Sequence, residues 1–295
     1  MTNELIYTIT GESSRGQVSS YHHKPNPLFL NKSKFKNDIA GLKKADLRTA
    51  IQFDGSEYSS KFTIGYEVEK NSLSRNAVKE YPLFCGFERD GSCGYEAVTH
   101  ILPLLPAGKW RTKVFNLFHQ AEKIIDDRFS PSDRRCGGHI TIAVDGLDGN
   151  EVREKVRQNC GIILSLFKKR LSNTFCNYNR TLLSYDNNSS SFRGGWHSKY
   201  QVALVKGNCL EFRIPSRFQS VKQCMRRYEL FYELVNFSIN KPNGTHDAFL
   251  KVIKPIILSM YNGNEDETNE VLRLAKLFRD YIVNNTIHPD IAQYV

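Results

Sequence analysis

The feature that most constrains this fold is a strict alternation of apolar and charged residues in short segments. In FTIGYEVE (62–69) every second residue is apolar, and Glu67 and Glu69 fall on the opposite face. Because successive side chains of a strand point to opposite faces of a sheet, this pattern predicts a β-strand with one apolar and one charged face. The pattern recurs in two later segments, 139–144 and 209–214. We therefore expect an antiparallel sheet, since such sheets can keep one polar face.

The charged faces of these segments carry groups that suit a metal ion. Glu67 and Glu69 stand two residues apart, which puts their carboxylates about 7 Å apart on one face. Like charges at that distance repel unless a cation lies between them, and carboxylates are preferred ligands of Mg²⁺ and Mn²⁺. His139 on the second segment, and Glu211 and Arg213 on the third, repeat the pattern. Each motif alone is more often an ordinary surface, but their recurrence on successive strands favours a metal site.

Helical periodicity and turn residues complete the predicted architecture. Residues 88–99 read as a second strand-like unit with a tight Asp-Gly turn, and 200–215 read as a hairpin. We expect helices at 38–51, 109–128, 151–171, 221–239, 246–260 and 267–283. The predicted fold class is α+β, an antiparallel sheet with helices packed on it. We expect a polar N-terminal lead-in at 1–60, a catalytic core at 61–240, and C-terminal helices packed on that core at 241–295.

Composition narrows the class of protein. Lys and Arg number 41 against 31 Asp and Glu, a net charge of +10 that suggests a polyanionic partner. The seven cysteines are scattered without any CxxC spacing, so we expect reduced thiols in a cytoplasmic protein. No apolar run suits a transmembrane helix, and the first residues lack a secretory pattern, so we expect no membrane partner. Neither a P-loop nor a GxGxxG turn after a strand is present.

Four motifs, in this order along the chain, resemble those of the amidoligases, a family of glutamine-synthetase-like carboxylate–amine ligases. They are GYEVE (65–69), DGS with EAV and LPL (90–92, 96–98 and 102–104), CGGHIT (136–141), and LEFRI (210–214) with Tyr200 ahead of it. The resemblance covers about residues 62–240. It departs from the family pattern at Thr141, where the family has a second His, and this leaves open an altered substrate choice or a degenerate site.

The resemblance implies a glutamine-synthetase-like fold, in which a curved antiparallel sheet has helices on its outer face and binds ATP and divalent metals on its concave face. It implies that Glu67, His139 and Glu211 hold the metal that bridges the ATP phosphates. It assigns Glu69 and Glu96 to a second metal nearer the substrate carboxylate.

Further roles follow from the same resemblance. Arg213 would neutralise the phosphoryl group during transfer, and it joins Glu96 and Asp90 as candidate catalytic residues. Asp90 or Glu88 would extend the ligand set of the second metal. The cations expected on ATP are Arg213, Arg180, Arg193 and Lys199. The long Ser/Asn/Gly-rich loop at 173–195 is equally well read as a lid, as a substrate clamp or as a plain surface excursion.

The activity implied is ATP-dependent ligation of a carboxylate to an amine through an acyl phosphate, with Mg²⁺ or Mn²⁺ as cofactor. The substrates could be small molecules, peptides or proteins. Two alternatives stay open. A nucleic-acid-binding or replication protein is suggested by the charge and by basic clusters at 32–44 and 168–170, but no matching motif favours it. A non-catalytic relative of the ligase fold is suggested by Thr141.

Overall fold

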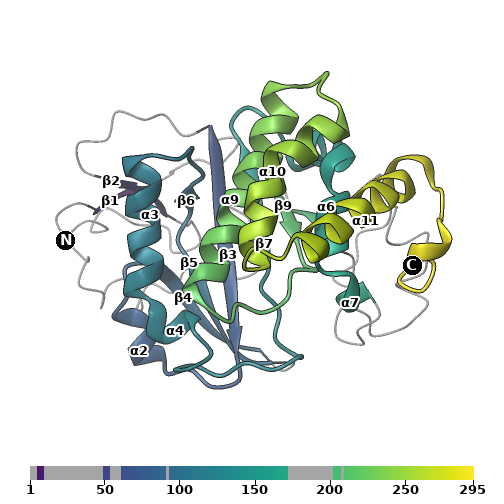
Figure 1. Cartoon of the computed structure of the whole chain (residues 1–295). Helices are drawn as coiled ribbons and strands as arrows, with labels where there is room; N and C mark the ends of the chain where they lie inside the picture. Colours follow the sequence, from purple (N-terminus) through teal and green to yellow (C-terminus); the bar gives the residue numbers. More distant parts are fainter. Residues whose placement is uncertain (1–4, 10–48, 54–60, 91–92, 172–201, 207–208) are drawn as a thin grey trace. The chain divides into compact units, whose positions relative to one another are not determined.

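A computed structural model describes residues 5–9, 49–53, 61–90, 93–171, 202–206 and 209–295 (Figure 1). The chain folds as two compact units. The first comprises Met1–Gly149, Lys206–Cys209 and Arg217–Met225, and the second comprises Asn150–Val205, Leu210–Ser216 and Arg226–Val295. The predicted loop at 173–195 and the cations Arg180, Arg193 and Lys199 lie outside the described residues.

The fold is α+β with a seven-stranded antiparallel sheet, as the alternating segments predict. The strand order is β4-β5-β3-β7-β9-β8, and the short β6 pairs with β3. The strands are β3 (Phe62–Lys70), β4 (Phe84–Asp90), β5 (Gly94–Thr99), β6 (Leu102–Pro103), β7 (Ile140–Val144), β8 (Ala203–Lys206) and β9 (Cys209–Phe212). β3 pairs with β5, β6 and β7, so it is the strand around which the first unit is organised.

Both faces of β3 are buried, although one of them carries charged groups. All nine residues from Phe62 to Lys70 are buried. On the apolar face, the ring of Tyr66 makes edge contacts with Phe118 of α3 (Lys109–Gln120) and with Phe218. The covering of the charged face is a tertiary effect, because the segment that precedes β7 folds over it.

Lys70 fixes the end of β3 from the apolar face. Its fully buried ammonium donates hydrogen bonds to the carbonyl oxygens of Ile125 and Phe218, at 2.7 and 2.8 Å, and to Oδ1 of Asp127 at 2.8 Å. Burial lowers the pKa of Lys70, and Asp127 opposes that effect. The pKa of Asp127 is lowered as well, because its bonds to Lys70 and Ser132 outweigh the effect of its own burial. The strand is thus tied to the chain segment after α4 (Glu122–Ile125).

Replacing Lys70 should destabilise the first unit strongly. Lys70→Met removes the donor for two buried carbonyls and for a partly buried carboxylate, so we expect a loss of about 3 kcal/mol in unfolding free energy. Urea unfolding measures this, and Lys61→Met, at an exposed position just before β3, is the control. Equal stability of the two variants would contradict the anchoring role.

Several of the predicted helices are present, but some of them begin or end at different residues. The first unit also holds α2 (Arg75–Lys79), and the helix expected at 109–128 is divided at Ala121 into α3 and α4. Helix α4 ends at Ile125 because Asp126 is extended and its carboxylate accepts a hydrogen bond from Arg128. The predicted helices near the C-terminus are present as α9 (Val221–Asn240), α10 (His246–Met260) and α11 (Glu265–Asn284), followed by the 3₁₀ turn η4 (Pro289–Ile291).

The single helix expected at 151–171 is wrong. The segment is broken into α5 (Gly149–Val156), η2 (Arg157–Asn159), α6 (Gly161–Leu166) and α7 (Lys168–Leu171). At Gly161 a Cβ would lie 2.2 Å from the carbonyl oxygen of Ala275, so only glycine permits this approach of α6 to α11. Ser165 then donates a hydrogen bond to the carbonyl oxygen of Val271 at 2.7 Å. Tertiary packing thus overrides the helical periodicity.

Two strands lie in the N-terminal region that was expected to be a lead-in with one helix. β1 (Leu5–Ile9) and β2 (Thr49–Phe53) pair antiparallel, with Leu5 opposite Phe53 and Ile9 opposite Thr49. The helix predicted at 38–51 is therefore wrong over its last residues, while its earlier part lies outside the described residues.

His246, at the start of α10, should make stability depend on pH. Its Nδ1 lies 3.2 Å from Oδ1 of Asn159, and burial, reinforced by the charge of Arg279, lowers its pKa from 6.5 to about 4. Between these two pH values His246 binds a proton in the unfolded chain but not in the folded chain. The free energy of unfolding therefore falls as pH drops from 6.5 to about 4. We expect this group to contribute about 3 kcal/mol across that window.

The difference in unfolding free energy between wild type and His246→Gln isolates the contribution of His246. Urea unfolding at a series of pH values should show a flatter profile for the variant, whose amide does not titrate. Parallel profiles for the two proteins would show that His246 is not responsible.

Candidate functional site

The imidazole of His139 lies between two carboxylates of β3. Its Nδ1 is 2.7 Å from Oε2 of Glu67, and its Nε2 is 3.6 Å from Oε1 of Glu69. The backbone N–H of Glu67 also donates to the carbonyl oxygen of His139 at 3.1 Å, which fixes the segment before β7 along β3. Glu67 and Glu69 are only 1% and 5% exposed, so the carboxylates are held away from bulk water. The structure thus brings together three residues that the sequence analysis named as candidate metal ligands.

Gly137 holds the second carboxylate in place. Its backbone N–H donates to Oε2 of Glu69 at 2.5 Å. A Cβ at this position would lie 3.0 Å from Nε2 of His139 and 3.1 Å from Oε1 of Glu69, closer than neighbouring groups ordinarily approach. The sequence analysis quoted Gly137 within a motif but gave it no role. The Gly-Gly pair before His139 was the signal that a close backbone approach was needed here.

Strand register extends the row of acidic residues. Glu96 of β5 lies directly opposite Glu69. In the backbone register Glu88 of β4 pairs with Glu96, but its side chain lies outside the described residues. Residues directly opposite one another in an antiparallel pair point to the same face, and like charges in that position destabilise the pairing. Glu96 is 3% exposed, so a cation bound between Glu69 and Glu96 would relieve their repulsion.

Glu211 and Arg213 lie at the end of β9. Glu211 is fully buried, and Nη1 of Arg213 donates to its Oε1 at 2.8 Å. The resemblance assigns Glu67, His139 and Glu211 to one metal; the first two belong to the first unit, and Glu211 belongs to the second. Two carboxylates and an imidazole form a donor set that fits Mn²⁺, and Mg²⁺ with added waters.

Two other positions from the sequence analysis have defined places in the sheet. Asp90 ends β4 and pairs with Gly94 of β5 in the backbone register, and residues 91–92 between the two strands lie outside the described residues. Thr141 of β7 is buried opposite Gly65, where the opposite strand offers no side chain.

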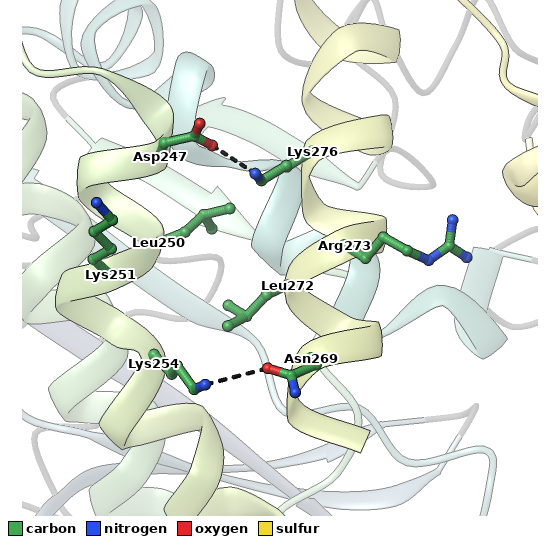
Figure 2. A pocket seen from close by; sticks show the side chains of 8 residues that line it. All are labelled: Asp247, Leu250, Lys251, Lys254, Asn269, Leu272, Arg273 and Lys276. Carbon is green, nitrogen blue, oxygen red and sulfur yellow. Dashed lines mark hydrogen bonds and ion pairs between the residues drawn. The ribbon is translucent and has the colours of Figure 1, made fainter. Parts of the chain in front are cut away.

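A hollow of about 390 Å³ between α10 and α11 in the second unit is a different kind of feature (Figure 2). Figure 2 shows Lys276 reaching Asp247, at 2.9 Å, and Lys254 reaching Asn269, at 3.2 Å, from one helix to the other. Lys254 also pairs with Glu265 at 3.1 Å, and Arg273 bonds Glu270 and Asp290. Each of these three cations thus has an acidic partner, and the residues that line the hollow offer no set of metal ligands.

Comparison with known proteins adds no assignment. No protein-family model matches the sequence, and no curated protein matches it at a significant level.

Among the described residues, no helix combines the length and the apolar character that crossing a bilayer requires.

Substituting Gly137 should disturb the site without unfolding the protein. In Gly137→Ala the added methyl group must displace His139 or Glu69, so we expect Mn²⁺ affinity to fall by about tenfold, as when other residues that hold metal ligands in place are changed. Electron paramagnetic resonance of free Mn²⁺ measures the affinity. Gly86→Ala is the matched control, since its Cβ would meet Val98 at an ordinary 3.4 Å. Equal affinities in the two variants would contradict the role of Gly137.

Proposed function

We propose that the protein is an ATP-dependent carboxylate–amine ligase of the amidoligase type, with a glutamine-synthetase-like sheet. The observation that carries the proposal is the imidazole of His139 between the buried carboxylates of Glu67 and Glu69, which belong to the central strand of an antiparallel sheet. The order of the four sequence motifs supports it. ATP, Mg²⁺ or Mn²⁺, a carboxylate and an amine are the ligands that this function requires.

The donor set fits divalent metals, which when bound would screen the triphosphate and stabilise charge on the transferred phosphoryl group. Glu67, His139 and Glu211 would hold one such ion, and Glu69 with Glu96 a second. In this proposal His139 would offer a ring nitrogen to the metal. The N–H of Gly137 keeps the carboxylate of Glu69 oriented.

The reaction needs no nucleophile from the protein. A carboxylate oxygen of the substrate attacks the γ-phosphorus, and the bond to the β–γ bridging oxygen breaks to release ADP. The nitrogen of the amine then attacks the acyl carbon, phosphate leaves, and the amine loses a proton to form the amide. Arg213 would offset negative charge on the phosphoryl group in flight. Acyl phosphates hydrolyse readily, so the burial of the carboxylates, which excludes bulk water, suits this chemistry.

Thermal unfolding tests ligand binding without knowledge of the substrates. ATP with Mg²⁺ should raise the midpoint more than either alone, because a ligand at a hundred times its Kd stabilises the native state by about 2.7 kcal/mol. Glu67→Gln keeps the size of the side chain but removes its charge and should abolish the shift. Glu122→Gln, an exposed residue of α4, should behave as wild type. Absence of any shift with both Mg²⁺ and Mn²⁺ would favour a non-catalytic relative.

Amine-dependent ADP release tests the chemistry itself. With mixtures of amino acids and amines as substrates, Glu67→Gln and Glu211→Gln should lose turnover while circular dichroism shows an intact fold. Wild-type turnover in both variants would disprove the assignment of the metal ligands.

The net charge of +10 keeps a nucleic-acid-binding function as the second candidate. Binding to generic DNA that weakens steeply between low and moderate salt would support that function. Absence of binding at low salt would remove it.

A further inference from the structure

Two buried thiols adjoin the candidate site in the first unit. Cys93 and Cys136 are 3% and 0% exposed. A side-chain hydrogen bond with Cys93 is the main cause that lowers the pKa of the Cys136 thiol from its ordinary value. Both are free cysteines. Cys136 immediately precedes Gly137, the residue whose backbone N–H holds Glu69, and stands three residues before His139.

The end of β3 holds both thiol-bearing segments at one corner. Cys93 precedes Gly94, which has a φ of +121° and packs so closely on Asn71 that a Cβ would lie 2.6 Å from the Asn71 carbonyl oxygen. Asn71 also holds the other segment, because its Nδ2 donates to Oδ2 of Asp133 at 3.1 Å. The carbonyl oxygen of Asp133 in turn accepts the backbone N–H of Cys136 at 3.1 Å. The backbone therefore holds the segment of Cys93 and the segment of Cys136 at the same end of β3.

We propose that Cys93 and Cys136 form a reversible disulfide that switches off the candidate metal site. This inference rests on the proposed function for its consequence, but the disulfide itself does not. A peroxide oxidises one thiol to a sulfenic acid, and its O–O bond breaks to release water or an alcohol. The second thiol then displaces the sulfenic oxygen as water, forming the S–S bond. Two equivalents of a reducing thiol reverse the two-electron oxidation.

The coupling to the site is mechanical. A disulfide fixes its sulfur atoms about 2.05 Å apart, much closer than two thiols in hydrogen-bond contact. Closing that gap draws the backbone at Cys136 toward Cys93, and Gly137 moves with it. The N–H of Gly137 then loses its short hydrogen bond to Glu69, and the imidazole of His139 loses its position between the two carboxylates. Because both thiols are buried, oxidation requires a local opening, and the switch responds slowly.

The test uses the full chain, treated with hydrogen peroxide or diamide and then with dithiothreitol. Intact mass should fall by two hydrogens, and peptide mapping should find the Cys93–Cys136 cross-link. Mn²⁺ affinity should drop at least tenfold on oxidation and recover on reduction. Cys93→Ser should bind Mn²⁺ as wild type does and should not respond to oxidant. Cys160→Ser, at a buried thiol bonded to the carbonyl oxygen of Val156, should respond as wild type does.

A second readout separates this inference from the proposed function. Hydrogen exchange at the Gly137 amide should be slow in the reduced protein and at least tenfold faster in the oxidised one, whether or not metal binds. Failure of the reduced protein to bind Mn²⁺ would overturn the proposed function, while exchange at Gly137 would still decide the switch. A cross-link between other cysteines, or an unchanged Gly137 amide in the cross-linked protein, would overturn the switch.

Discussion

Burial of ionisable groups on both faces of one strand is the constraint on which the first unit depends. An ionised side chain in a protein interior costs several kcal/mol unless partners compensate for its lost hydration. Lys70 meets that condition with two carbonyls and Asp127. On the opposite face, Glu67 and Glu69 meet it in part through His139 and the amide of Gly137. A strand held so firmly on one side can keep carboxylates in fixed positions on the other.

The candidate site is therefore part of the packed interior of the first unit. The segment before β7 contributes the Gly137 amide and the His139 imidazole, and its backbone bonds directly to Glu67. The Asn71 contacts hold the same segment at its other end. A small displacement of this segment also moves the carboxylates, because the segment bonds to them directly and packed interiors transmit strain. This rigidity is what makes both the Gly137 substitution and the thiol switch sensitive probes of the site.

The strands of the sheet were predictable because a period of two is unambiguous when one face is apolar. That pattern identified β3, β7 and β9 and placed Glu67, Glu69, His139 and Glu211 on their polar sides. The helix at 151–171 was mispredicted because periodicity records which residues face a core but not where another helix approaches. Gly161 admits the backbone of α11, and the helix breaks there. Likewise, the pairing of β1 with β2 joins segments far apart in sequence, which local pattern does not reveal.

The α+β class, the central strands and the polar side of each strand came from the sequence, since these follow from alternation along single segments. Only the tertiary structure shows that the charged face is buried, that Gly137 supports Glu69, that Lys70 anchors the strand, and that the segments of Cys93 and Cys136 adjoin. Each of these depends on contacts between residues far apart in the chain. Such contacts form only when the segments pack, and no local periodicity encodes them.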